Sequence, residues 1–252
     1  MNAKTVTFKR LKSVGVITLH TPRAKSNIAA QMAEEMAQIC HTIRTDDTIR
    51  VVLVTGDGQK AFSTGLAPEQ FKNKAVTLPS IAGPVAELTC PTIAVINGDA
   101  IGQGLELALA CDIRIAADKA HFCIPHITSG LIPWDGATQR LLRTVGFTKA
   151  MEMVLTGEII DAAEALRIGL VSKVVSSGEL IPTAEEMART MALRSPSALQ
   201  FAKEAVTKGM DLTLAQGLRL EGDLYFLLQT TEDRTEGIKA FREKRPPTFK
   251  GK

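Results

Sequence analysis

Hydrophobic and polar positions follow two different periods along the first three quarters of the chain. Short runs rich in Val and Ile predict β-strands, and the segments between them carry apolar residues at three- and four-residue intervals, which predicts amphipathic helices. This order of elements indicates an α/β fold. The expected strands are 14–19, 50–55, 92–96, 113–116 and 170–175, and the expected helices are 29–44, 81–88, 104–111, 137–145 and 148–156.

Helical patterns dominate from Asp161 onward. Asp161 followed by Glu164 forms a plausible capping box, Pro196 after Ser195 suits a first helical position, and a further amphipathic run begins at Asp211. No strand-like run follows residue 196. We therefore expect an α/β core over residues 1–192 and a C-terminal helical region over 193–252 that acts as a cap or in oligomerisation.

Composition excludes several classes of protein. The 252 residues include 45% hydrophobic residues, enough for one sizeable core. The 30 basic and 27 acidic residues give a net charge of +3, and the basic residues are scattered except in the C-terminal tail, so we expect no nucleic-acid partner. Residues 1–10 carry three basic residues and no apolar run, which argues against a signal peptide, and the most apolar stretch, 92–117, is interrupted by charged residues, which argues against a membrane span.

The four cysteines are far apart and never form a C-x-x-C pair. Neither a zinc ribbon nor a disulfide scaffold fits this spacing, and we expect no metal. A reducing, cytoplasmic compartment is the simplest expectation.

Two glycine-punctuated segments follow β-type runs at points where a helix is due to begin. In the first, Gly65 permits a turn that leaves the N–H of Leu66 unpaired; in the second, Gly102 and Gly104 bracket Gln103 at a helix start. If these N–H groups converge, they form an oxyanion hole, in which one donor is typically worth about 3 kcal/mol of transition-state stabilisation. Alternatively, the glycines serve only turns and packing.

The position of Glu106 favours an oxyanion hole over a role for these glycines in turns and packing alone. It lies near the start of a helix whose other members, residues 105 and 107–110, are apolar. A carboxylate in that position is either a partner of the helix dipole or a working acid or base beside the oxyanion donors. The glycines do not match the dinucleotide fingerprint G-x-G-x-x-G, and there is no Walker lysine, so nucleotide chemistry is disfavoured.

Several segments together resemble the crotonase, or enoyl-CoA hydratase/isomerase, superfamily. The resemblance covers nearly the whole chain. It implies a ββα superhelical core with a helical C-terminal region, assembly as a homotrimer or a dimer of trimers, and acyl-coenzyme A thioester substrates without a separate cofactor. The matching segments are 61–66, 91–112, 125–141, 151–157, 162–171 and 240–245.

The resemblance also implies roles for individual residues. The thioester oxygen sits between two backbone N–H groups, which match Leu66 and Gln103; the family usually has glycine at the second position. Trp134 and Leu131 match the acyl pocket, although Trp134 equally suits core packing. Lys25 and Lys244 equally suit solvated surface charges. The residues expected to bind coenzyme A are Arg23, Ala24, Lys25, Ala61, Ser63, Gly65, Phe241 and Lys244.

The second acidic position is the main departure from the family. Hydratases of this family use two glutamates; the first matches Glu106, and the second falls at His126. His126 either replaces the missing acid, disables the reaction, or is a hydrogen-bonded histidine near the pocket. Asp135 is an auxiliary catalytic candidate, one residue away from an aspartate of some relatives. Ala67 replaces an aspartate usual after the first oxyanion residue.

The expected activity is therefore that of an acyl-CoA lyase resembling enoyl-CoA hydratase. Glu106 is the expected base and His126 the expected partner acid. Fatty acid metabolism is the expected context. Loss of the second glutamate weighs more against isomerisation than against hydration. The alternatives are another enolate reaction on the same fold, such as isomerisation, thioester hydrolysis or dehalogenation, and a non-catalytic acyl-CoA-binding scaffold.

Overall fold

The computed structural model describes residues 4–20, 28–58, 61–65 and 79–252. Within these ranges, the larger of two sheets has the strand order β1-β2-β3-β5-β7-β10. β1 and β2 form an antiparallel hairpin, and every other neighbouring pair is parallel. The strands are β1 (Val6–Leu11), β2 (Val14–Leu19), β3 (Val51–Gly56), β5 (Thr92–Ile96), β7 (Ile113–Ala117) and β10 (Lys173–Val175).

The smaller sheet has the order β4-β6-β8-β9, with β9 antiparallel to β8. Its strands are very short: β4 (Ala61–Ser63), β6 (Asp99–Ile101), β8 (His121–Cys123) and β9 (Ile160–Asp161). A strand of the larger sheet is followed three times by a strand of the smaller sheet and then by a helical segment. This repeat is the expected ββα superhelix.

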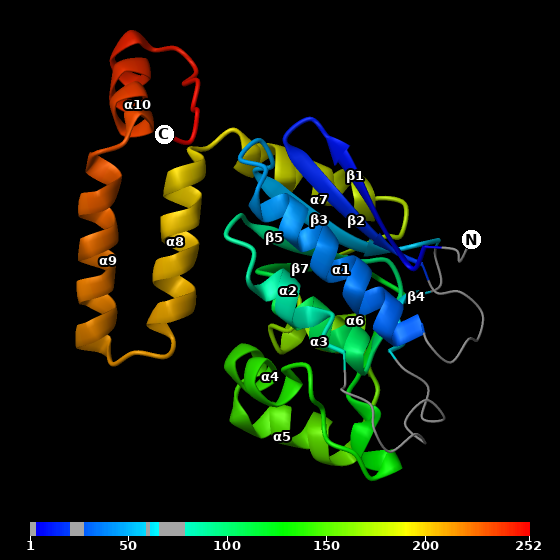
Figure 1. The fold of residues 1–252 in the computed structure, drawn as a ribbon. Coiled ribbons are helices and arrows are strands. Elements are labelled where there is room, and N and C mark those ends of the chain that lie inside the picture. Colours follow the sequence, from blue (N-terminus) through cyan, green and yellow to red (C-terminus); the bar gives the residue numbers. More distant parts are fainter. Residues whose placement is uncertain (1–3, 21–27, 59–60, 66–78) are drawn as a thin grey trace.

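Helices cover both faces of the larger sheet and continue into a C-terminal arm (Figure 1). They are α1 (Ile28–Arg44), α2 (Ala82–Ala86), α3 (Gln103–Ala110), α4 (Ala137–Val145), α5 (Phe147–Thr156), α6 (Ala162–Arg167), α7 (Leu180–Ala192), α8 (Pro196–Gly209), α9 (Leu214–Gln229) and α10 (Glu232–Glu243), with a 3₁₀ helix, η2, at Pro125–Ser129. Among the described residues, no helix is both long and apolar enough to cross a bilayer.

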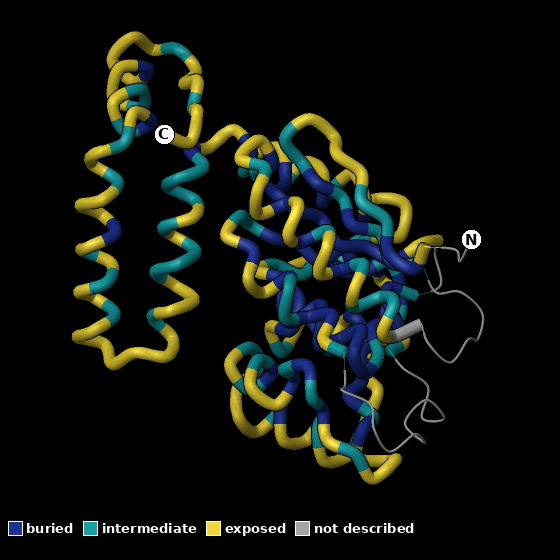
Figure 2. Tube along the Cα trace, in the orientation of Figure 1, coloured by how far each residue is buried: buried dark blue, intermediate teal, exposed yellow. Residues whose placement is uncertain are grey.

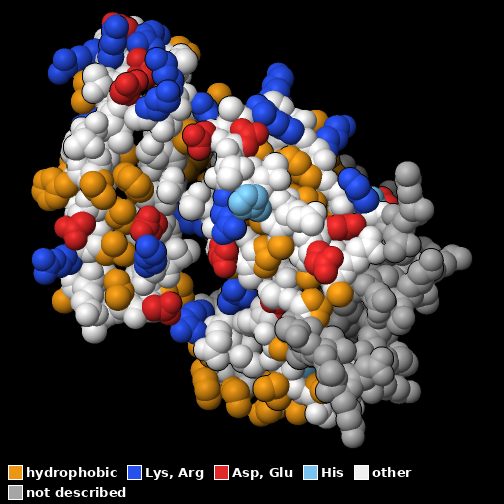
Figure 3. Space-filling model, viewed as in Figure 1, with side chains coloured by type: hydrophobic (Ala, Val, Ile, Leu, Met, Phe, Trp, Pro, Cys, Tyr) orange, Lys and Arg blue, Asp and Glu red, His pale blue; other side chains and the backbone are white. Residues whose placement is uncertain are grey.

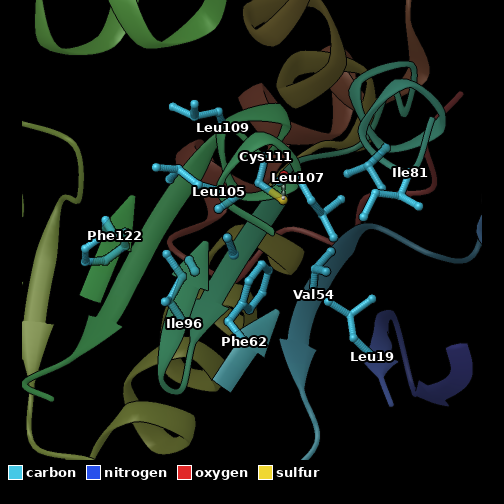
Figure 4. Close-up of a cluster of buried hydrophobic side chains, with 14 of the residues drawn as sticks. Leu19, Val54, Phe62, Ile81, Ile96, Leu105, Leu107, Leu109, Cys111 and Phe122 are labelled. Atoms are coloured by element: carbon cyan, nitrogen blue, oxygen red, sulfur yellow. Dashed lines mark hydrogen bonds between the residues drawn. The ribbon is translucent and has the colours of Figure 1, made fainter. Parts of the chain in front are cut away.

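The main core lies between the two sheets and helices α1–α3. Phe62 of β4, Ile96 of β5 and Phe122 of β8 converge there with leucines of α3 (Figure 4). A second core lies on the other face of the larger sheet, where α7 presents residues at four-residue intervals, Leu180, Ala184, Ala188 and Ala192. Burial on both faces explains why β3 and β5 are apolar throughout.

The expected elements are largely confirmed, but the short strands β4, β6, β8 and β9 were not expected, and two further differences occur in the larger sheet. The strand expected at 170–175 begins only at Lys173, because Leu170 and Val171 donate their N–H groups to the carbonyl of Ala165 at the end of α6. β1 was not expected at all. It is the edge strand of the larger sheet, and its last three residues, from Lys9, are exposed, which obscures any alternation.

Helices α8, α9 and α10 form an arm that stands beside the core (Figure 1). The expected boundary after residue 192 falls between α7 and α8. Most of the arm is exposed or half-buried (Figure 2): α8 has no buried residue, and α9 buries only Leu224. Lys203 of α8 pairs with Asp112 at 2.8 Å, and Arg50 donates to the carbonyl of Phe249 at 2.6 Å. These contacts hold the arm against the core.

Candidate active site

The first turn of α3 packs directly against β4. A Cβ atom on Gly104 would collide with the carbonyl of Ser63, so only glycine permits this approach of the helix to the strand. Gly65 follows with a φ of +68°, and a Cβ atom there would lie 3.0 Å from the nitrogen of Gln103. The chain thus brings Gly65 next to the N–H of the first residue of α3. That N–H has no partner within the helix.

Glu106 lies in the same first turn and is completely buried. Its Oε1 atom accepts hydrogen bonds from the N–H groups of Asp135 at 2.8 Å and Ala137 at 3.0 Å. Its Oε2 atom has no hydrogen-bond partner among the described residues. Burial raises the pKa of Glu106 to about 7, although the two backbone hydrogen bonds act in the opposite direction.

His126 faces the free side of this carboxyl group from η2. Its Nε2 atom lies 3.9 Å from Oε2 of Glu106, and burial lowers the pKa of the imidazole. Nδ1 has no hydrogen-bond partner in the part of the chain that the structure describes. Trp134 packs edge-on against the imidazole, with ring centroids 5.1 Å apart, and Leu131 donates its N–H to the carbonyl of His126. The structure therefore brings His126, Trp134 and Leu131 together beside Glu106.

The carboxylate of Asp135 is enclosed by protein donors. Its Oδ2 atom accepts from the N–H groups of Ile81 at 2.8 Å and Ala82 at 3.0 Å, and from Nε2 of Gln103 at 3.0 Å. The Ser80 hydroxyl donates to Oδ1. All of these groups except Ser80 are almost fully buried. Asp135 thus borders the site, but its carboxylate faces α2 and Gln103.

Gln103 contributes to the site through two separate parts. Its side chain turns toward the segment before α2, where Nε2 also donates to the carbonyl of Pro79 at 2.8 Å. Its backbone N–H remains at the start of α3, beside Gly65. A side chain in place of the usual glycine is therefore compatible with a main-chain donor at this position.

Comparisons with known proteins agree on one family. The family model for enoyl-CoA hydratase/isomerase matches residues 9–252. A probable enoyl-CoA hydratase of Mycobacterium leprae is 40% identical over 99% of both chains. The chain belongs to the enoyl-CoA hydratase/isomerase family. Its fold is the crotonase fold: the crystal structure of an enoyl-CoA hydratase from Bacillus anthracis matches with a TM-score of 0.92 and 37% identity, covering 98% of this chain and 100% of that one.

Other members of this family have more specific names. The 2,3-dehydroadipyl-CoA hydratase of Escherichia coli is 39% identical, covering 96% of this chain and 97% of its own. The (E)-benzylidenesuccinyl-CoA hydratase of Thauera aromatica is 38% identical, covering 98% of this chain and 99% of its own. Both names refer to hydration of a coenzyme A thioester.

Several residues expected to bind substrate lie outside the described residues, namely Leu66, Arg23, Ala24 and Lys25, as does Ala67, the residue that replaces an aspartate usual in the family. Ala61 and Ser63 are the ends of β4, next to the first turn of α3. Phe241 and Lys244 lie on and directly after α10, at the far end of the arm from β4 (Figure 1). The structure therefore does not bring these two residues to the site within one chain.

Two residues that were not expected from the sequence contact Asp135, whose N–H donates to Glu106. Ser80 lies in an irregular segment, and Arg140 donates from α4 to the carbonyl of Asp135 at 2.9 Å. The direct partners of Oε1 are main-chain N–H groups, which no residue type reveals. The 3.6-residue pattern of α4 was the only signal that this helix starts near Ala137.

Proposed function

We propose that this protein is an enoyl-CoA hydratase that adds water to the double bond of a 2-enoyl-CoA thioester. The observation that carries the proposal is the buried pair of Glu106 and His126 beside the first N–H of α3. Each side chain presents one buried polar atom that has no partner among the described residues. Buried polar atoms usually bond to protein or to ordered water, so these two atoms are places where a water molecule or a polar substrate group can bind.

The two pKa shifts support a specific distribution of one proton between the pair. Burial raises the pKa of Glu106 to about 7 and lowers the pKa of His126, so on the acidic side of pH 7 the carboxyl group holds a proton more readily than an ordinary glutamate and the imidazole loses its proton more readily than an ordinary histidine. The sequence analysis assigned the base to Glu106 and the acid to His126. The shifts favour the reverse in the free enzyme: Glu106 is the proton donor, and the neutral imidazole is the base.

The reaction then balances without any further reactant. His126 accepts a proton from water as the water oxygen bonds to the β-carbon, and the electron pair of the double bond moves toward the thioester carbonyl to give an enolate. Glu106 gives its proton to the α-carbon, which restores the carbonyl. The pair ends with its one proton on His126. Because 3.9 Å is too long for a direct hydrogen bond, His126 releases this proton to water and Glu106 takes one up from water, which restores the starting state.

A main-chain oxyanion hole is the second part of the proposal. The N–H of Gln103 is one donor, and the N–H of Leu66 is the expected other. Gly65, the residue before Leu66, lies against the nitrogen of Gln103, which supports this assignment. Donors fixed by a helix start and a strand end need no reorganisation when negative charge develops on the thioester oxygen.

Loss of the enoyl absorbance of crotonyl-CoA tests the proposal. Glu106→Gln and His126→Ala are each expected to lower kcat by about 10²- to 10⁴-fold, the usual contribution of general acid–base catalysis. Two matched controls alter exposed residues of the same types, Glu158→Gln and His121→Ala, and both should keep the wild-type rate. Mass spectrometry must show a gain of one water. An unchanged product mass would indicate isomerisation, and binding without turnover would indicate a scaffold; either result contradicts the proposal.

We also propose that the protein is a homo-oligomer, a trimer or a dimer of trimers. Apolar side chains lie exposed on the arm and on α5 (Figure 3), where Phe147, Met151 and Leu155 share one face at four-residue spacing. Large exposed apolar patches mark protein–protein contacts. Because Phe241 and Lys244 are remote from β4 in their own chain, a neighbouring chain is needed to bring them to a coenzyme A site.

A reducing, cytoplasm-like compartment completes the proposal. All four cysteines are free thiols, and three of them are buried. Free buried cysteines are typical of proteins that remain reduced in the cell.

A further inference from the structure

Asp135 connects three parts of the site through its side chain and its main chain. Its carboxylate holds the first N–H groups of α2 and the side-chain amide of Gln103, and its own N–H donates to Oε1 of Glu106. Its carbonyl accepts from Arg140 of α4. Both oxygens of the carboxylate are engaged by protein donors, so neither is directed at a reacting group.

These contacts determine where the donors of Glu106 lie. Asp135 and Ala137, the two N–H donors, belong to one short segment, residues 135–137, that leads into α4. Fixing the Asp135 side chain between α2 and α3 fixes the start of this segment. Displacement of the segment would move the carboxyl group of Glu106 away from His126.

We propose that Asp135 is a positioning residue that holds the Glu106 carboxyl group against His126 and uses Gln103 as its anchor on α3. The proposal rests on the hydratase function proposed above, and it assigns Asp135 a different role from that of an auxiliary acid or base. It also gives a purpose to Gln103 at a position where the family usually has glycine.

The charge of Asp135 adds an electrostatic effect that supports this role. Among the described residues, the titratable and charged groups that face Glu106 are His126 of η2, Asp135 before α4 and Arg140 of α4. The negative charge of Asp135 raises the pKa of Glu106, and Arg140 lowers it, while burial remains the largest cause of the shift. Removal of the Asp135 charge without loss of its shape should therefore lower the pKa of Glu106.

Two variants of Asp135 separate geometry from charge. In Asp135→Asn, the amide oxygen can accept from the backbone N–H groups of Ile81 and Ala82 and from the side-chain amide of Gln103. Its NH₂ group can donate to the hydroxyl oxygen of Ser80. It keeps the shape and removes the charge. Asp135→Ala removes both. Gln103→Met keeps the backbone N–H of residue 103 and removes only the anchor, and Asp47→Asn on the exposed surface is the control.

Titration of the Glu106 carboxyl carbon by ¹³C NMR, with the resonance assigned by its loss in Glu106→Gln, is the first measurement. It needs no substrate, so it tests the inference even if the protein does not hydrate enoyl thioesters. We expect a lower pKa for Glu106 in Asp135→Asn than in wild type and no change in Asp47→Asn. An unchanged pKa in Asp135→Asn would overturn the electrostatic part of the inference.

Hydration of crotonyl-CoA is the second measurement. Asp135→Ala should lower kcat by about 10- to 100-fold with little change in KM, as is common when a supporting residue is lost. Gln103→Met should lower kcat in the same direction, and Asp135→Asn should retain most of the rate at the optimum of its own pH profile. A wild-type kcat in Asp135→Ala would overturn the positioning role.

Discussion

The Oε2 atom of Glu106 lies 3.9 Å from Nε2 of His126, and both residues are buried. The separation is longer than a hydrogen bond, so the two groups do not satisfy each other. In the proposed mechanism, this pair performs the acid–base steps that the family resemblance assigns to two glutamates. Four predictions follow from this pair and from the elements that surround it.

The first prediction concerns the pH dependence of kcat/KM. The active form holds one proton on the pair. It gains a second proton below the lowered pKa of His126, and it loses its proton above the pKa of Glu106 at about 7. We expect a narrow bell-shaped profile whose alkaline limb falls about tenfold per pH unit well above neutrality.

Initial rates with crotonyl-CoA across pH 5–9 measure this profile. The acidic limb should disappear from the residual activity of His126→Gln, whereas His121→Ala should give the wild-type curve because His121 is exposed on β8. A rate that stays constant from about pH 6 to 9 would show that the pair does not control turnover.

The second prediction links the same carboxyl group to stability. The pKa of Glu106 is raised in the folded state to about 7, so the folded protein binds this proton more tightly than the unfolded chain does. This contribution is complete below the unfolded pKa of about 4.3 and is lost as pH rises through 7. At 1.36 kcal/mol per pKa unit, the free energy of unfolding should fall by about 4 kcal/mol over that interval.

Urea unfolding of wild type and Glu106→Gln at pH 5 and pH 8, at one protein concentration, measures this effect. The variant should gain stability relative to wild type at the higher pH, because glutamine has no charge to desolvate. Glu158→Gln at an exposed position should show the same difference from wild type at both pH values. A pH-independent difference for Glu106→Gln would contradict the prediction.

The third prediction concerns the contact of α3 with β4. In Gly104→Ala the new methyl group would meet the backbone of Ser63, so either the helix or the strand must move. We expect a loss of about 1–3 kcal/mol in the free energy of unfolding, as for other overpacked sites, and a fall in kcat/KM of about 100-fold from displacement of the Gln103 N–H.

Gly209→Ala is the matched control, since residue 209 ends α8 and a Cβ atom there meets nothing within 4 Å. Thermal unfolding and crotonyl-CoA hydration of both variants should separate them. Equal activity of Gly104→Ala and Gly209→Ala would mean that the close approach of α3 to β4 does not position the site.

The fourth prediction concerns the C-terminal arm. Leu214, Leu218 and Tyr225 lie on one face of α9 and are 80%, 58% and 58% exposed. A buried charge without a partner is costly, so Leu218→Glu should dissociate the oligomer. Sedimentation equilibrium should give the mass of one chain for Leu218→Glu and a multiple of it for Gln229→Glu, an exposed position near the end of α9. A wild-type assembly in Leu218→Glu would exclude this face from the interface.

Much of the fold could be predicted from local pattern. Strands β3 and β5 are continuous apolar runs, and α3 starts where Gly102 and Gly104 punctuate the sequence. The strands of the smaller sheet span only two or three residues, too few to display a period of two. β1 carries charged residues because it is an edge strand, and its pairing with β2 is a tertiary fact.

Some features of the site could likewise be predicted from the sequence, and others could not. Glu106 was identifiable as the single carboxylate on an apolar helix, and His126 through its match to a family position. The opposite pKa shifts of the two residues could not be predicted from the sequence, because they depend on burial by residues far apart in the chain. The position of the Asp135 carboxylate was also hidden, since two of its four donors are main-chain N–H groups more than 50 residues earlier in the chain.

The donor at the start of α3 belongs to the main chain, and every residue except proline carries it. Natural selection can therefore exchange the side chain at position 103 without loss of that contact to the substrate. In the proposed mechanism, Gln103 provides one group for the reaction through its backbone, and its side-chain amide binds the Asp135 carboxylate. A codon at the centre of a catalytic site can thus vary between lineages while the chemistry stays the same.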